Sequence, residues 1–216
     1  MAQLRAALFD FDGTLVDTEG QYSIFWGKTA RTYRPDIPGL ENIIKGTTLT
    51  QIFSRYFPDP QLQQTIQKGL DAWEAQMDYP WVAGAEAFLR DLKAHGVRVA
   101  VVTSSNLTKM AVVNRKFAGF TELIDRVLTS EDFAASKPDP DCYLKGAAAM
   151  GCQLDECIVF EDAFTGLQAG MSSGIYTVGL TTGNPRSAIE DKCHRVIDNF
   201  EGLTYETAAR WIADAQ

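Results

Sequence analysis

The chain has few residues of the kinds that most often bind zinc or form disulfides. It contains two histidines, His95 and His194, and four cysteines, with no Cys-x-x-Cys pair among them. Zinc sites and Cys–His nucleophile pairs need such residues at short, regular spacings. We therefore expect neither kind of site, and we expect the thiols to be reduced and buried.

Positive charge and long apolar runs are also scarce. Lysine and arginine number 20 against 28 aspartates and glutamates, which gives a net charge of −8. Because nucleic-acid binding depends on clustered positive charge, we expect no nucleic-acid partner. No apolar run approaches the roughly 20 residues that cross a bilayer, and the N-terminal run is too short for a signal peptide. We therefore expect a cytoplasmic protein without a membrane partner.

Aromatic residues are plentiful, with 12 Phe, 7 Tyr and 4 Trp among 216 residues, enough to bury a large core. Short apolar runs typical of buried strands alternate with helical patterns. The expected strands are residues 6–11, 97–103, 126–129, 157–161, 175–179 and 195–197. The expected helices are residues 83–94, 107–117, 140–150 and 165–172. This alternation predicts an α/β domain with a parallel sheet covered on both faces.

One segment departs from the alternation. Residues 18–79 contain helical patterns interrupted by proline and glycine, with no convincing strand. The segment directly follows the first strand, so it is typical of a small helical domain inserted into the α/β domain. We expect residues 17–79 to form the inserted domain, and residues 1–16 and 80–216 to form the α/β domain.

The strongest local signal is the segment DFDGTLVD, at residues 10–17, where the first predicted strand ends. In an extended chain, residues two apart point to the same side, so we expect Asp10 and Asp12 to project together. They would project from the carboxyl edge of the sheet, where open α/β sheets bind ligands. Gly13 allows a sharp turn and a close approach of the backbone to a ligand.

Polar residues also follow three later strands, and each set has a structural alternative. Thr103, Ser104 and Asn106 could bind an anion at a helix start, or could merely cap that helix. Lys137 precedes a Pro-x-Pro turn and could face the carboxylates or solvent. The last set is an acid pair, Glu161 and Asp162. It could ligate Mg²⁺ or complement a helix dipole.

The four segments, in this order, resemble the motifs of the haloacid dehalogenase superfamily. DFDGTLVDT matches the first motif in full, and the segments of Thr103, Lys137 and Glu161-Asp162 match the second, third and fourth. The resemblance covers nearly the whole chain and implies a Rossmann-like core with a cap domain. An insertion directly after the first motif is similar to the helical-cap subclass. That subclass includes phosphoglycolate phosphatase, sugar-phosphate phosphatases and β-phosphoglucomutase.

The resemblance also implies roles for individual residues. Asp10 would be the nucleophile that forms an aspartyl-phosphate, and Asp12 the general acid and base. The phosphoryl group would be bound by Thr103 and Lys137, with Ser104, Asn106 and Gly13 beside them. Mg²⁺ would be held by Asp10, Asp162, the Asp12 backbone carbonyl, and Glu161 directly or through water. The dication and Lys137 would lower the pKa of Asp10 and keep it ionised. Asp12 also argues against dehalogenation, which needs no proton donor for the leaving group.

The inserted domain should select the substrate. We expect contacts from Tyr22, Lys45, Gly46 and Thr47. Tyr22 and Leu49 fall where β-phosphoglucomutases have a histidine and a phosphate-binding arginine, so the grip on a second phosphate is incomplete. This favours a phosphatase whose substrate is a small phosphorylated metabolite, a sugar or polyol phosphate. We expect the protein to be a monomer or a dimer. A phosphosugar mutase is the alternative, and a catalytically silent binding protein is the alternative of another class.

Overall fold

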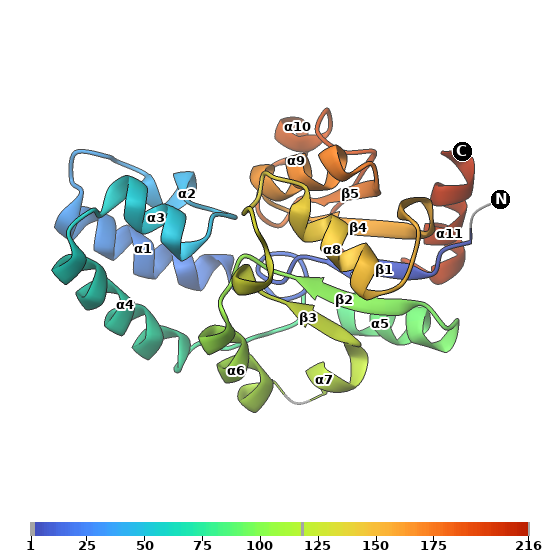
Figure 1. The fold of residues 1–216 in the computed structure, drawn as a ribbon, viewed down its shortest axis with the longest axis horizontal. Coiled ribbons are helices and arrows are strands. Elements are labelled where there is room, and N and C mark those ends of the chain that lie inside the picture. The colour runs from blue at the N-terminus through green and yellow to red at the C-terminus, as the bar shows by residue number, and fades with distance from the viewer. Residues whose placement is uncertain (1–2, 118, 216) are drawn as a thin grey trace.

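A parallel six-stranded sheet forms the centre of the molecule (Figure 1). The structure is a computed structural model that describes residues 3–117 and 119–215. The sheet order is β3-β2-β1-β4-β5-β6, and every neighbouring pair is parallel. The strands are β1 (Ala6–Phe9), β2 (Arg98–Val102), β3 (Arg126–Leu128), β4 (Cys157–Glu161), β5 (Tyr176–Leu180) and β6 (Arg195–Ile197). The predicted α/β Rossmann-like fold with an inserted helical cap is confirmed.

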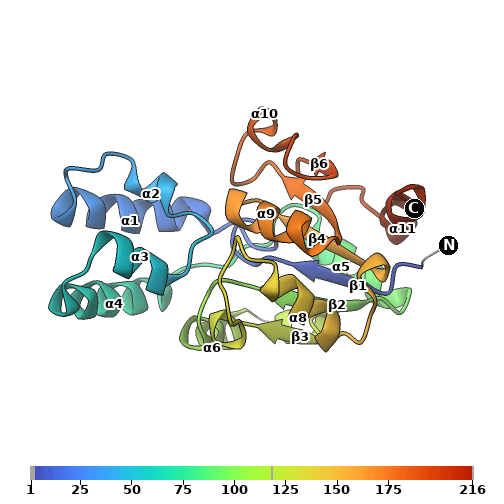
Figure 2. The ribbon, with the colours of Figure 1, turned by 45° about the horizontal axis from the view of Figure 1, so that its top comes forward.

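Helices cover both faces of the sheet (Figure 2). The helices of this part are α5 (Ala85–Ala94), α6 (Leu107–Lys116), α7 (Phe120–Leu123), α8 (Asp141–Ala149), α9 (Phe164–Ser173), α10 (Arg186–Ile189) and α11 (Tyr205–Asp214). Alternate residues of β1 face opposite sides. Ala7 and Phe9 pack with α5, α6, α7 and α11, whereas Ala6 and Leu8 pack with α8 and α9. Burial on both faces explains why β1 is a continuous apolar run.

The remaining α-helices form a separate group, set apart from the sheet in Figure 1. They are α1 (Glu19–Tyr33), α2 (Leu40–Ile43), α3 (Leu49–Tyr56) and α4 (Pro60–Glu74), and they share an apolar core of their own. Two linkers join this helical cap to the sheet domain. They run side by side, with Asp17 N–H donating to the Pro80 carbonyl and Val82 N–H to the Leu15 carbonyl, both at 2.9 Å. The cap boundaries of 17 and 79 remain a prediction.

The structure agrees with most of the predicted elements and adds others. The strands at 157–161 and 195–197 have the predicted bounds, whereas β1 ends at Phe9, two residues earlier than predicted. The helices α7, α10 and α11 were missed. All four cysteines are free, with Cys142, Cys152 and Cys157 buried and Cys193 only half-buried. Among the described residues, no helix is both long and apolar enough to cross a membrane.

Candidate active site

The carboxyl ends of β1, β2 and β4 meet at one cavity, because β1 lies between the other two strands. The cavity has a volume of about 510 Å³ and is lined by both the sheet domain and the cap. The sequence-predicted residues in its lining are Asp10, Asp12, Tyr22, Lys45, Gly46, Thr47, Thr103, Ser104, Asn106 and Asp162. The other predicted residues, Gly13, Lys137 and Glu161, are not part of that lining.

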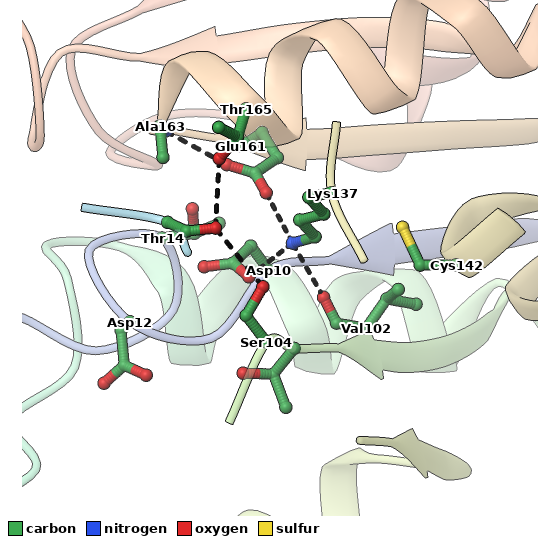
Figure 3. A network of polar contacts seen from close by, with 12 residues as sticks. Asp10, Asp12, Thr14, Val102, Ser104, Lys137, Cys142, Glu161, Ala163 and Thr165 are labelled. Carbon is green, nitrogen blue, oxygen red and sulfur yellow. Dashed lines mark hydrogen bonds and ion pairs between the residues drawn. The ribbon is translucent and has the colours of Figure 1, made fainter. Parts of the chain in front are cut away.

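A buried lysine links the ends of the three strands (Figure 3). The Lys137 side chain is 2% exposed, and its ammonium donates to Asp10 Oδ1 at 2.7 Å and to Glu161 Oε1 at 2.6 Å. It also donates to the carbonyl of Val102 at 3.1 Å. These three acceptors use all three protons of an ammonium group. Lys137 is therefore fixed between β1, β2 and β4, and the solvated alternative for this residue is wrong.

Glu161 is held on both of its oxygens. Oε1 accepts from Lys137 and from the Tyr143 hydroxyl, the latter at 3.0 Å. Oε2 accepts from the backbone N–H groups of Asp162 and Ala163, at 2.9 and 3.0 Å. Four donors engage both oxygens of the carboxylate, which favours a positioning role for Glu161 over direct metal binding.

Asp10, Glu161 and Asp162 form the acidic cluster. One carboxylate oxygen from each lies within 4.8 Å of the others, a spacing that suits a cation site. Because four donors engage Glu161, the candidate carboxylate ligands are Asp10 and Asp162. Two glycines leave room for the Asp162 side chain. A Cβ added at Gly13 or Gly183 would lie 2.3 or 2.0 Å from Asp162 Oδ2. The carboxylate is thus cradled by backbone, and the Thr14 hydroxyl donates to its Oδ1 at 3.1 Å.

Burial dominates the electrostatics of this cluster. Burial raises the pKa of Asp10 to about 7, although Lys137 pulls the value down. Burial and the neighbouring acids Glu161 and Asp10 likewise raise the pKa of Asp162. The sequence predicts that a dication and Lys137 together lower the pKa of Asp10. Lys137 alone does not lower it below its ordinary value. The protein's own groups leave an excess of buried negative charge, which a bound cation would offset.

The position of Asp12 two residues after Asp10 predicted that the two side chains project together. The structure shows a different arrangement. Figure 3 shows its carboxylate directed away from the Asp10–Lys137–Glu161 cluster. The chain leaves the strand at Phe9 and turns tightly, with Leu15 N–H donating to the Phe11 carbonyl at 2.9 Å. The two-residue periodicity of an extended chain therefore no longer applies.

The Asp12 carboxylate is held by donors from the linker before α1, from the loop after β2 and from α6. The Thr18 hydroxyl donates to Oδ1 at 2.7 Å, and the Ser105 hydroxyl donates to Oδ2 at 3.1 Å. Lys109, on the first turn of α6, forms an ion pair with the same Oδ2. Lys109 is 4% exposed, and its ammonium lies 4.6 Å from the centre of the Tyr22 ring in the cap.

Sequence reasoning missed Lys109 and the residue that pairs with Tyr22. Lys109 lies three residues after Asn106, on the helix that starts from the β2 loop, and this position was the available signal. Glu74 accepts a hydrogen bond from the Tyr22 hydroxyl at 2.8 Å. Nothing in the pattern around Glu74, at the end of α4, distinguished it from a solvated glutamate.

The segment after β2 combines capping with access to the cavity. Asn106 Oδ1 accepts from the Lys109 N–H at 2.9 Å and caps α6, as the structural alternative predicted. Thr103 is buried, and its hydroxyl accepts from the Ser105 N–H at 3.0 Å. The Ser104 hydroxyl donates to the carbonyl of Gly46 at 3.4 Å. A phosphate-binding role for these residues stays a prediction.

The cap loop around Gly46 lies directly on the sheet domain. The Gly46 carbonyl also accepts from Thr165 at 3.0 Å, and its φ of +70° belongs to the left-handed region. A Cβ at Gly46 would lie 2.6 Å from the Ala163 Cβ. Lys45 forms an ion pair with Glu19 at 2.9 Å, and the Thr47 hydroxyl donates to the Ile44 carbonyl.

Comparison with known proteins agrees with the fold and the motifs. Residues 7–180 match the family described as haloacid dehalogenase-like hydrolase. The validoxylamine A 7'-phosphate phosphatase of Streptomyces hygroscopicus subsp. limoneus is 29% identical over 198 residues, covering 87% of this chain and 90% of that protein. Hexitol phosphatase A of Escherichia coli is 28% identical over 189 residues, 82% of each chain. The crystal structure of β-phosphoglucomutase from Clostridium difficile superposes with a TM-score of 0.81 at 20% identity, covering 100% of this chain and 99% of that one.

Proposed function

Because the chain belongs to the haloacid dehalogenase-like hydrolase family, we propose that it is a phosphatase that hydrolyses a small phosphate monoester. The observation that carries this proposal is the Asp10 carboxylate, which lines the cavity while its Oδ1 is held by buried Lys137. A nucleophile fixed beside a cation suits attack on a phosphoryl group. The names of the relatives, a phosphatase for validoxylamine A 7'-phosphate and a hexitol phosphatase, favour a sugar or polyol phosphate.

The donor set suits a divalent cation such as Mg²⁺. Its ligands would be the carboxylates of Asp10 and Asp162 and the backbone carbonyl of Asp12. Glu161 would orient Lys137 through the hydrogen bond between them. The glycine cradle around Asp162 and the excess of buried acid support this assignment. When bound, the ion would offset negative charge on the phosphoryl oxygens and the carboxylates.

The chain's own residues divide the reaction into two displacements. Asp10 attacks phosphorus, forming a bond from its carboxylate oxygen to phosphorus while the bond to the substrate alcohol breaks. Asp12 gives the departing alkoxide its proton. Asp12 then takes a proton from water, whose oxygen attacks phosphorus and releases Asp10 and inorganic phosphate. Thr103 holds a phosphoryl oxygen through both steps. Lys137 joins it by exchanging one of its three present acceptors for a phosphoryl oxygen, because its ammonium protons are all engaged.

Asp12 must move to perform this role. Its carboxylate contacts Lys109, Ser105 and Thr18, and Figure 3 shows it directed away from Asp10. A rotation about the Asp12 side-chain bonds would bring the carboxyl group toward the leaving oxygen. Before it can protonate the leaving alkoxide, Asp12 must therefore leave its ion pair with Lys109 and take up a proton from solvent.

Hydrolysis is favoured over a mutase reaction by the charges near the cap. A mutase must hold both ends of a bisphosphate, but the cap-side cation Lys45 is already paired with Glu19. Lys109 belongs to α6 of the sheet domain rather than to the cap, and the position of Leu49 carries no charge. The cap, which we place at residues 17–79, therefore offers little to a second phosphate.

Phosphate release tests the proposal directly. The panel contains hexitol and hexose monophosphates, phosphoglycolate and nucleotides, each with Mg²⁺ and with a chelator, and with Asp10→Asn as the blank. We expect Mg²⁺-dependent release from at least one sugar or polyol phosphate and none from Asp10→Asn. Rapid isomerisation with negligible phosphate release would favour the mutase. No turnover of any ester would favour a silent binding protein.

A further inference from the structure

A buried carboxylate lines the cap side of the cavity and belongs to none of the four motifs. Glu74, the last residue of α4, is 6% exposed and lines the same cavity as Asp10 and Asp12. The Tyr22 hydroxyl donates to its Oε1 at 2.8 Å. Within residues 3–117 and 119–215, no hydrogen bond or ion pair involves Glu74 Oε2. One oxygen of a buried acid is therefore available to whatever enters the cavity.

The position of Glu74 is costly for stability alone. A buried carboxylate is unfavourable unless a cation or several donors compensate it. The nearby cation Lys109 forms its ion pair with Asp12, and the ring of Tyr22 lies 4.6 Å from the Lys109 ammonium. Burial accordingly raises the pKa of Glu74, an effect that Lys109 only partly opposes. An apolar residue would pack more favourably here, so the presence of a carboxylate indicates that this position binds a ligand.

The rest of the cap-side lining combines apolar residues with polar ones and has more acids than cations. The apolar ones are Trp26, Ile44, Leu49, Ile52, Phe53 and Leu70. Gln67 and Thr50 line it as well, together with a further acid, Glu41. Its lysine, Lys45, is neutralised by Glu19. Such a lining provides hydrogen-bond acceptors for hydroxyl groups and a negative field that repels anions.

We propose that Glu74 is a specificity-determining residue that accepts a hydrogen bond from a hydroxyl on the alcohol half of the substrate. The same carboxylate excludes substrates that carry a second anionic group at that end. Tyr22 positions Glu74 by holding Oε1, which leaves Oε2 to face the substrate. This inference rests on the proposed phosphatase function and narrows its substrates to phosphate monoesters of polyhydroxylated, otherwise uncharged alcohols.

Glu74→Ala tests the hydroxyl contact. The readout is the ratio of kcat/KM for a hexitol monophosphate to kcat/KM for hexyl phosphate, which has the same carbon length and no hydroxyls. We expect this ratio to fall about tenfold or more, the range for losing a hydrogen bond to a charged group. Glu86→Ala, on the exposed face of α5, is the matched control and should leave the ratio unchanged. An unchanged ratio in Glu74→Ala would overturn the inference.

Glu74→Gln tests the exclusion of anions and keeps the shape of the side chain. We expect kcat/KM for a hexitol bisphosphate, relative to the monophosphate, to rise about threefold or more, since a repulsive charge is gone. Glu86→Gln should not change this ratio. A ratio that stays constant, or falls, in Glu74→Gln contradicts the inference. If Glu74→Ala does not fold, the hexitol-to-hexyl ratio is measured in Glu74→Gln, where a loss of about threefold or more is expected because a neutral acceptor is weaker.

A purely structural role for Glu74 predicts a different pattern. If Glu74 only fastened the cap through Tyr22, its variants would unfold at lower temperature and lose activity equally on all esters. Selectivity ratios separate the two roles, because they cancel any loss of folded protein. If the wild type hydrolyses these esters and the kcat/KM ratios are unchanged in the Glu74 variants, the specificity role of Glu74 is wrong while the phosphatase proposal stands. Absence of phosphate release from every ester in the wild type defeats the phosphatase proposal, and this inference with it.

Discussion

Replacing Lys137 by methionine tests whether one buried cation holds the acidic cluster together. Methionine keeps the apolar part of the side chain but removes the ammonium and its three hydrogen bonds. The carboxylate of Glu161 is 1% exposed, so no water replaces the lost partner. Breaking a buried ion pair from one side typically costs about 3–5 kcal/mol, because the other charge remains buried and uncompensated. We expect the free energy of unfolding of Lys137→Met to fall by that amount at pH 8.

The same reasoning predicts a partial rescue. Adding Glu161→Gln to Lys137→Met removes one of the two carboxylate charges left without their cation, and the amide oxygen still accepts hydrogen bonds. The double variant should be more stable than the sum of the two single losses predicts, with a coupling energy of about 1–3 kcal/mol. Strictly additive losses would contradict the assignment of the instability to stranded charge.

Urea unfolding in the presence of a chelator measures these changes through the fluorescence of the four tryptophans. Lys145→Met is the control. Its side chain is 40% exposed and pairs with Asp141 one turn away on α8. Such an exposed pair contributes about 0.5 kcal/mol or less. A loss below about 1 kcal/mol in Lys137→Met, similar to the control, would refute the idea that Lys137 compensates the cluster.

Further predictions concern the nucleophile, pH and the cap loop. Asp10→Asn should lower phosphate release by about three orders of magnitude or more, whereas comparable release would exclude Asp10 as the nucleophile. In chelator, the pKa of about 7 for Asp10, above its ordinary 3.8, means that the fold favours the protonated carboxyl. The free energy of unfolding should therefore fall by up to about 4 kcal/mol as pH rises from about 4 to about 7. The dependence of the free energy of unfolding on pH should be weaker in Asp10→Asn. Urea titrations of the wild type and Asp10→Asn across that pH range measure it, and the same dependence in both proteins would contradict the prediction. Gly46→Ala should lower kcat/KM about tenfold, because its Cβ meets the Ala163 Cβ at 2.6 Å and the left-handed φ disfavours alanine. Gly20→Ala on α1, with nothing within 4 Å, is the control for that steady-state assay, and equal activities would show that loop contact is unnecessary.

The sheet domain was largely predictable because its residues obey strong local rules. The continuous apolar run before Asp10 fits only a strand buried on both faces, and the strand ends of a parallel sheet necessarily share one edge. That geometry places Asp10, Glu161 and Asp162 on the same edge of the sheet, and the pairing of β1 with β4 brings them together. The position of Lys137 depends on a loop, and its proximity to Asp10 followed from the family resemblance rather than from spacing.

Asp12 shows where local rules stop. Its direction is set by the turn at Gly13 and by donors from α6 and the linker before α1, none of which strand periodicity encodes. Glu74 is harder still, because its partner Tyr22 lies on another helix of the cap. Periodicity predicts that α1 and α4 exist, but their relative rotation follows from side-chain packing in the cap core. Tyr22, Lys45, Gly46 and Thr47 line the cavity as expected, whereas the pairing of Tyr22 with Glu74 was beyond prediction from pattern alone.

The position of Glu74 in the cap suggests that substrate selection and cap closure use different parts of the cap. Tyr22 lies on the first turn of α1 and Glu74 is the last residue of α4, so both are close in sequence to the linkers, which pair at Asp17 and Pro80. In a rotation about such a hinge, atoms move in proportion to their distance from it. Opening of the cap should therefore separate the Gly46 loop from the sheet domain while Glu74 stays near Asp12. Contacts at Glu74 can then select a substrate during entry, and contacts at Gly46 can form only after the cap has closed over it.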